Sequence, residues 1–169
     1  MSAFTLPSLN DVLSATPAFI LPSGRPKTVI VTSGARGIGG RAVRAFHTHG
    51  CNVVIADLPS ARHGAEFLIA SLEDSDRVLF HGTDITNWQA MANLFRTTRE
   101  IFGQIDIVTA DAGLMENRGF FEFDENENGE IEESAVAYDI IDVHLKGSMN
   151  SMSSLDIGPG WLTWRKHFD

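Results

Sequence analysis

Several features that define whole classes of protein are absent from this sequence or scarce in it. Its 169 residues include one cysteine, Cys51, which excludes a disulfide within the chain and a cysteine-based metal cluster and suits a reducing compartment. No apolar run approaches the roughly 20 residues of a membrane-spanning helix. The first 24 residues contain no Lys or Arg to begin a signal peptide. We therefore expect a cytoplasmic protein with no membrane partner.

Positive charge is scarce as well. The chain carries 13 Lys and Arg against 22 Asp and Glu, and its formal net charge is −9. This balance disfavours a sequence-independent grip on nucleic-acid phosphates or anionic lipid. The hydrophobic share of 43% and the charged share of 21% are ordinary for a soluble globular domain. We expect one such domain, with no nucleic acid among its partners.

Short β-branched runs alternate with helical patterns along most of the chain. The runs predict strands at Thr28–Thr32, Asn52–Asp57, Val78–His81 and Ile105–Ala110. Helices are predicted at Ile38–His49, at Arg62–Leu72, from a capping box of Thr86 and Gln89 up to Gly103, and from Ser134 to about Met149. This alternation predicts right-handed β-α-β units around a parallel sheet.

The two ends of the chain differ from this pattern. Residues 1–26 are rich in proline and are predicted to form an extension wrapped over the body, and residues 27–150 form the predicted domain. Residues 151–169 carry Trp161, Trp164 and Phe168. We expect this tail to pack on the domain or on a partner chain.

A glycine-rich segment lies between the first predicted strand and the first predicted helix. Its Gly37-x-Gly39-x-x-Ala42 spacing lets the backbone approach a pyrophosphate, which the N–H groups of the helix N-terminus also attract. Asp57 ends the next strand, 18 residues past Gly39, where its carboxylate suits ribose hydroxyls and repels a 2′-phosphate. The pattern predicts dinucleotide binding, with NAD(H) favoured over NADP(H), although Arg36 lies nearby. The alternative is a turn that serves only helix–strand packing.

These residues and two further motifs resemble those of the short-chain dehydrogenase/reductase family. The family's Thr-Gly-x-x-x-Gly-x-Gly is matched by Thr32, Gly37 and Gly39, with Ser33 in place of the first glycine. Asp84-Ile85 is similar to its adenine-contacting pair, and Ala110-Asp111-Ala112-Gly113 to its Asn-Asn-Ala-Gly motif.

The resemblance covers about residues 27–150 and implies both a fold and a cofactor site. The implied fold is α/β, a Rossmann-like three-layer α/β/α domain with a shortened parallel sheet in the strand order 3-2-1-4. The implied contacts to the cofactor are Ser33, Gly34, Arg36, Gly37, Ile38, Gly39, Asp57, Asp84, Ile85, Ala112 and Gly113.

The resemblance also implies alcohol–carbonyl oxidoreduction on a small organic substrate, with one departure. Family members use a Tyr-x-x-x-Lys motif for proton transfer, and these 169 residues, whose one tyrosine is Tyr138, contain no such motif. His144 stands at the position of the family's catalytic asparagine, and Asp111 comes from the strand end beside it. We therefore expect a truncated family member in which Asp111 and His144 form a substitute acid–base pair.

Two other functions stay open at this point. One is a non-redox enzyme, an isomerase, cyclase or lyase that uses Asp111 and His144. The other is a non-catalytic remnant of the cofactor fold with a binding or regulatory role. The family also implies a homo-oligomer, a dimer through the helix that contains His144. We expect no metal, because the calcium-loop pattern that begins at Asp124 has Ala135 where the twelfth position needs a glutamate.

Overall fold

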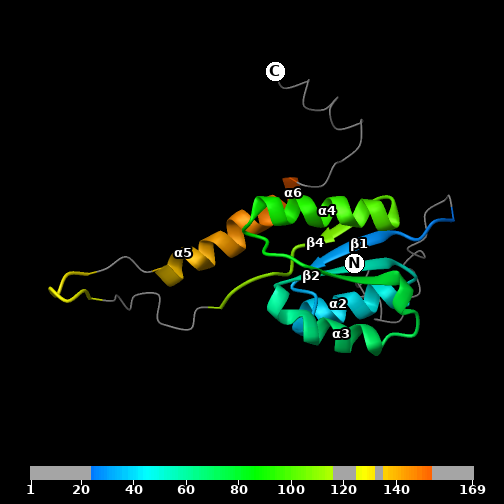
Figure 1. Cartoon of the computed structure of the whole chain (residues 1–169), viewed down its shortest axis with the longest axis horizontal. Coiled ribbons are helices and arrows are strands. Elements are labelled where there is room, and N and C mark those ends of the chain that lie inside the picture. Colours follow the sequence, from blue (N-terminus) through cyan, green and yellow to red (C-terminus); the bar gives the residue numbers. More distant parts are fainter. Residues whose placement is uncertain (1–23, 116–124, 132–134, 154–169) are drawn as a thin grey trace, which may run out of the picture.

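A four-stranded parallel sheet forms the centre of the domain (Figure 1). The computed structural model describes residues 24–115, 125–131 and 135–153, so most of the predicted extension and the aromatic residues of the tail lie outside it. The sheet has the order β3-β2-β1-β4, which confirms the predicted fold class and strand order. The strands are β1 (Thr28–Thr32), β2 (Asn52–Asp57), β3 (Val78–Gly82) and β4 (Ile107–Thr109).

Strand β4 is shorter than the predicted run Ile105–Ala110. It pairs with β1 over three residues, and within the described ranges no strand pairs with its outer edge. At both ends of β4 a side chain takes the place of a backbone partner: the Asp106 carboxylate accepts the N–H of Thr28, and the Thr32 hydroxyl accepts the N–H of Ala112. The parallel pairing places the carboxyl ends of all four strands at one edge of the sheet.

Helices cover both faces of the sheet and give the domain its three layers. Figure 1 shows α2 (Gly37–Thr48) and α3 (Arg62–Ala70) on one face and α4 (Trp88–Phe102) on the other. Single turns of 3-10 helix, η1 (Pro59–Ala61) and η2 (Ser75–Arg77), precede α3 and β3. The core beneath α2 and α3 includes Val29, Val31, Val43, Val53, Ile55 and Leu68, and the core beneath α4 includes Ile30, Val54, Met91, Leu94 and Phe95.

The predicted capping box at the start of α4 is wrong. Asn87 is the N-cap, and its side-chain oxygen accepts a hydrogen bond from the N–H of Ala90 at 3.1 Å. Thr86 instead donates its N–H and its hydroxyl to Oδ1 of Asp84, at 2.9 and 2.8 Å. An aspartate two residues upstream thus holds Thr86 in a turn, which leaves Gln89 without its capping partner.

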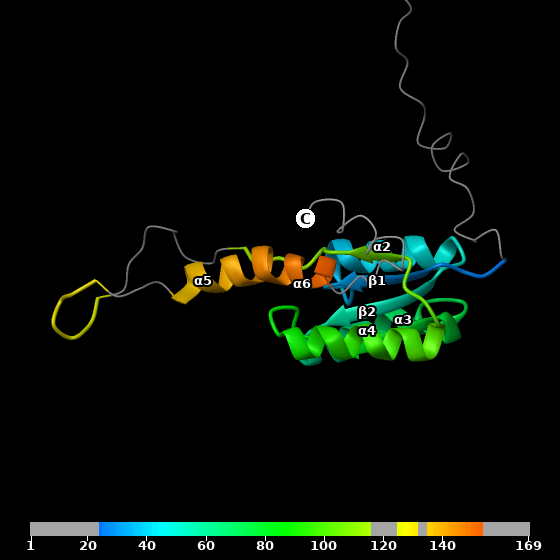
Figure 2. The ribbon, with the colours of Figure 1, turned by 90° about the horizontal axis from the view of Figure 1, so that it is seen from above.

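The last described segment is one long helix with a change of pitch in its middle. It runs through α5 (Ala135–Ile141), the π-helical segment η3 (Asp142–Gly147) and α6 (Ser148–Ser153). In Figure 2 the α5 end projects away from the sheet, while α6 lies beside it. The sequence predicted this helix but not its π-helical segment, which contains His144. No helix in the described part of the chain is long and apolar enough to cross a bilayer.

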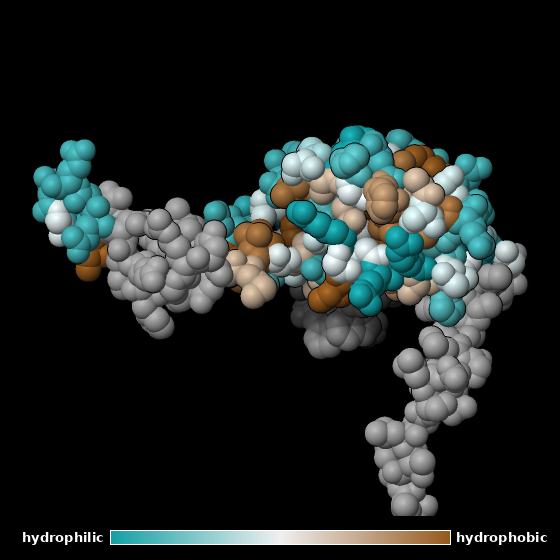
Figure 3. All heavy atoms as spheres, turned by 90° about the horizontal axis from the view of Figure 1, so that it is seen from below, coloured by the Kyte–Doolittle hydropathy of each residue, from teal (hydrophilic) through white to brown (hydrophobic). Residues whose placement is uncertain are grey.

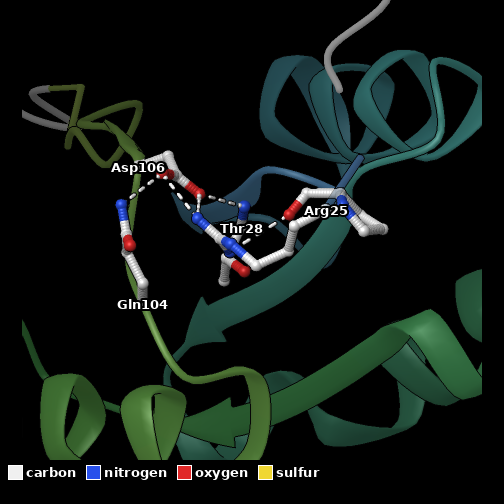
Figure 4. A network of polar contacts seen from close by, with 5 residues as sticks. Arg25, Thr28, Gln104 and Asp106 are labelled. Atoms are coloured by element: carbon white, nitrogen blue, oxygen red, sulfur yellow. Dashed lines mark hydrogen bonds and ion pairs between the residues drawn. The ribbon is translucent and has the colours of Figure 1, made fainter. Parts of the chain in front are cut away.

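An ion pair joins the segment before β1 to the segment before β4. Arg25 contacts both oxygens of the Asp106 carboxylate at 3.1 Å, and the N–H of Thr28 and the side-chain amide of Gln104 donate to the same carboxylate at 2.8 Å (Figure 4). The Asp106 side chain is 9% exposed. Four donor contacts converge on this carboxylate at the amino ends of β1 and β4.

His81 is expected to make the stability of the domain depend on pH. Its ring, half-buried on β3, lies 2.7 Å from the hydroxyl of Thr83 and 3.3 Å from the side-chain nitrogen of Asn93. Burial lowers the pKa of His81 below its ordinary 6.5, so the unfolded chain binds this proton more readily than the folded one. The free energy of unfolding should therefore fall as the pH drops below about 6.5.

Urea denaturation at pH 7.5 and at pH 5.5 tests this expectation. The midpoint should drop at the lower pH in the wild type and drop less in His81→Gln, which keeps a polar side chain but cannot take up the proton. Equal drops in the two proteins would show that His81 does not carry the effect. Asp74 does not interfere, because its pKa is held below 3.8 by Arg77 and it stays charged over this range.

Candidate functional site

A pocket of about 120 Å³ opens at the carboxyl ends of the strands. Residues that follow β1, β2, β3 and β4 meet there, together with one residue of η3. Among the predicted cofactor residues, those lining the pocket are Ser33, Asp57, Asp84, Ile85, Ala112 and Gly113; the lining residues that the sequence did not single out are Ala56, Leu58, Thr83, Leu114 and Val143.

The other predicted contacts lie beside the pocket, on the turn that enters α2. The side of Gly37 on which a Cβ would lie is open, and its φ of +60° suits glycine. Helix α2 begins after Arg36 without a side-chain cap, so the turn leaves its first N–H groups for a ligand. Arg36 and Ile38 are exposed, whereas Gly34 and Gly39 are buried in the turn.

Gly39 holds the turn closed by its lack of a side chain. A Cβ at this position would overlap the carbonyl oxygen of Ser33, which is backbone and has little room to move. Gly34 is less tight, but a Cβ there would still lie only 2.9 Å from the carbonyl oxygen of Val31. The two glycines therefore allow a tight turn with close contacts between backbone atoms, as the predicted phosphate turn requires.

Asp57 braces the turn from the end of β2. One carboxylate oxygen accepts the N–H of Ala35 at 3.0 Å, and the other accepts the N–H of Leu58 at 2.8 Å. Each oxygen keeps a second lone pair, so these bonds orient the carboxylate and leave it able to accept from a ligand. The bond to Ala35 depends on a neighbour 22 residues away, and no local sequence signal announces it.

The wall at Ile85 is held by the long helix. The carbonyl oxygen of Ile85 accepts from the side-chain amide of Asn150 at 2.8 Å. The buried side chain of Ile85 fills the space where a Cβ of Gly147 would lie. A glycine inside a helical pattern, as Gly147 is, can signal such a close approach. No sequence signal indicates the hydrogen bond of Asn150.

The predicted acid–base pair of Asp111 and His144 is not formed in this structure. Nε2 of His144 lies 2.8 Å from the carbonyl oxygen of Leu114 and 3.1 Å from its N–H, and the ring sits against Gly113. Asp111 is exposed, and no hydrogen bond or ion pair joins it to His144. His144 therefore connects η3 to the segment after β4, because its Nε2 interacts with the backbone of Leu114. A catalytic role for either residue stays a prediction.

The calcium-like loop was not expected to hold a metal. Asp124 lies outside the described residues, and in the described part of the loop Oδ1 of Asn126 accepts from the N–H groups of Asn128 and Glu130. These bonds close a turn between the bridged residues Glu125 and Ile131. Among residues 24–115, 125–131 and 135–153, no group of three potential metal ligands comes together.

Comparison with known proteins gives the same family from sequence and from structure. A family model for short chain dehydrogenases matches residues 27–155. Short-chain dehydrogenase reductase 3a of Arabidopsis thaliana is 38% identical over 95 residues, which are 56% of this chain and 36% of that protein. Short-chain dehydrogenase/reductase ascJ of Acremonium egyptiacum is 34% identical over 128 residues, 75% of this chain and 39% of that protein.

A solved structure shows the same arrangement of elements. The crystal structure of the short-chain dehydrogenase/reductase SDR:Glucose/ribitol dehydrogenase from Brucella melitensis superposes with a TM-score of 0.66 and 26% identity, over 78% of this chain and 51% of that one. The chain thus spans about half of this structure and less of the two curated relatives. Since the family model matches well over half of its residues, the chain belongs to the short-chain dehydrogenase/reductase family.

Proposed function

We propose that this chain binds NAD(H) as the cofactor-binding part of an alcohol–carbonyl oxidoreductase that acts on a small organic substrate. The observation that carries the proposal is the position of Asp57, which lines the pocket and whose carboxylate accepts the N–H of Ala35 in the glycine turn. Residues 27–150 would form this unit, and residues 151–169 would form a tail that packs on it or on a partner chain. The free, buried thiol of Cys51 supports a reducing compartment such as the cytoplasm.

The residues of the pocket suit this cofactor. Asp57 offers acceptors for ribose hydroxyls, Ile85 and Leu58 offer apolar surface for a flat base, and the start of α2 offers N–H donors for a pyrophosphate. When bound, the nicotinamide supplies or accepts the hydride of the reaction. The protein's part is to orient it: Asp57 and the glycine turn would hold the adenosine half, and Gly113, which lines the same pocket, would also contact the cofactor.

Calorimetric titration tests both the binding and the preference between cofactors. We expect NADH to bind more tightly than NADPH, because the negative charge of Asp57 repels a 2′-phosphate. In Asp57→Asn, NADH affinity should fall about tenfold, as expected for the loss of a charged hydrogen bond, and the preference over NADPH should shrink.

The control is Asp76→Asn, which removes an equal charge from η2, outside the residues that line the pocket. It should leave both affinities unchanged. Failure of the wild-type protein to bind NAD⁺ or NADH would contradict the proposed function. Equal affinity for NADH and NADPH would contradict the preference alone.

The long helix supports a second copy of this chain as a partner. Four apolar side chains follow one another along this helix at intervals of four, four and three residues, which places them on one face. They are 49 to 70% exposed: Ile141, Leu145, Met149 and Met152. Figure 3 shows hydrophobic residues, in brown, at the junction between the projecting arm and the body of the domain. An apolar stripe of this length is typical of a helix–helix interface.

Light scattering after size-exclusion chromatography measures the oligomeric state. The wild-type protein should have the mass of a dimer, and Leu145→Glu should shift it toward the monomer, because a charge would be buried in the interface. Lys146→Glu changes the neighbouring residue, which pairs with Asp142 off the stripe, and should leave the mass unchanged. A wild-type monomer at micromolar concentration would be inconsistent with this proposal.

A further inference from the structure

Ser33 has a backbone conformation that a residue with a side chain rarely adopts. Its φ is +53°, and among the described residues every other positive φ belongs to a glycine. In this region the Cβ of an L-residue crowds its own backbone, so the conformation costs free energy that a glycine would not spend. The family fingerprint has a glycine at this position.

The neighbours of Ser33 impose that conformation. On one side, the hydroxyl of Thr32 bonds the carbonyl oxygen of Thr109 at 3.2 Å and accepts the N–H of Ala112 at 3.1 Å, which fixes the end of β1 to the segment after β4. On the other side, Gly39 packs against the carbonyl oxygen of Ser33. The backbone cannot relax without opening the turn.

The fold itself makes no visible use of the serine side chain. Across the ranges that the structure describes, no hydrogen bond engages the Ser33 hydroxyl, although the residue is half-buried. Ser33 also lines the pocket, together with Asp57. A strained residue whose polar group is unused by the fold and borders a binding pocket indicates a functional role.

We propose that the Ser33 hydroxyl hydrogen-bonds the adenosine ribose beside Asp57, and that this contact is gained at the expense of stability. The inference rests on the proposed NAD(H) function. The ribose is the favoured partner because Ser33 and Asp57 line the same pocket, whereas Gly37 and Gly39 of the phosphate turn do not.

Two substitutions separate the strain from the hydroxyl. Ser33→Gly removes both, so the thermal midpoint should rise while the affinity for NADH falls about five- to tenfold. Ser33→Ala removes the hydroxyl and keeps the strain, so the affinity should fall to the same extent with no rise in the midpoint. Ser75→Gly, in η2 and outside the residues lining the pocket, is the control and should leave the affinity unchanged without raising the midpoint.

Titration with AMP, which has the adenosine ribose but no pyrophosphate, locates the contact. Both Ser33 variants should lose affinity for AMP as they do for NADH. Unchanged or tighter NADH binding by Ser33→Gly would overturn the inference, as would a loss confined to NADH, which would place the contact on the pyrophosphate. If the wild-type protein binds NADH and these results fail, the inference alone falls; if it binds neither NAD⁺ nor NADH, the proposed function falls with it.

Discussion

Gly39→Ala is expected to destabilise the domain strongly and to abolish NADH binding, whereas Gly40→Ala, one residue further along α2, is expected to be tolerated. The Cβ of an alanine at residue 39 would overlap the carbonyl oxygen of Ser33. Because the obstacle is backbone, relief requires the turn to open and to move Ala35 away from Asp57. Overpacking of this kind costs about 1–3 kcal/mol and occasionally more, and we expect the upper end of that range.

Gly40 provides a matched comparison in the same turn of helix. The nearest atom to a Cβ at this position, the carbonyl oxygen of Gly34, would lie 3.6 Å away, which is ordinary contact. Alanine is favoured over glycine in a helix by about 1 kcal/mol, so Gly40→Ala should raise the free energy of unfolding slightly or leave it unchanged.

Urea denaturation followed by circular dichroism measures both variants, and NADH titration shows the state of the turn. Similar free energies of unfolding for the two variants would refute the tight contact at Gly39. A stable Gly39→Ala variant that still binds NADH at wild-type affinity would show that the turn does not need to close as described.

Asp106→Ala is expected to lower the free energy of unfolding by about 2–4 kcal/mol. Removing one partner of a buried ion pair costs about 3–5 kcal/mol, and the cost is smaller here because the Arg25 side chain is 30% exposed. The substitution also leaves the N–H of Thr28 without its side-chain acceptor at the start of β1. The network lies at the amino ends of the strands, so NADH affinity should be retained once the protein is folded.

Arg25→Ala tests how the effect divides between the ion pair and the backbone contact. It leaves the buried Asp106 carboxylate without its cation but still bonded to Thr28 and Gln104. Because these two donors partly compensate the charge, we expect a cost of about 1–2 kcal/mol, less than that of Asp106→Ala. A loss in Asp106→Ala no larger than that in Arg25→Ala would show that the contact to Thr28 contributes nothing. Urea denaturation of the two single variants and the double variant gives the coupling directly.

Local patterns sufficed for the central part of the fold. The runs Thr28–Thr32 and Asn52–Asp57 were predicted with the bounds that the structure has. Both are central strands with buried β-branched residues: all five residues of the first, and Val53, Val54 and Ile55 of the second. The predictions were less accurate where neighbours compete. Thr86 had the spacing of a cap but is held by Asp84, and the run Ile105–Ala110 forms only the three-residue strand Ile107–Thr109.

In the candidate site, too, the positions of residues were predicted better than the contacts of their side chains. Asp57 was assigned from its place at the end of a predicted strand, and Ser33, Asp84 and Gly113 were assigned from the resemblance to the family's motifs. Parallel pairing brings all four to one pocket. The substitute acid–base pair was inferred from aligned positions alone, and the structure instead bonds His144 to the backbone of Leu114. Alignment places a residue along the chain but does not determine which neighbour its side chain meets.

The sequence by itself therefore determined the class of fold and the turn where a dinucleotide is expected, because periodicity and glycine spacing are local properties. The order of the strands was implied by the resemblance to the family. Tertiary structure alone decided that Gly39 closes on Ser33, that Asp57 braces Ala35 and that Ser33 is strained with a free hydroxyl at the pocket. Each of these depends on distances between segments that meet only when the sheet and helices pack.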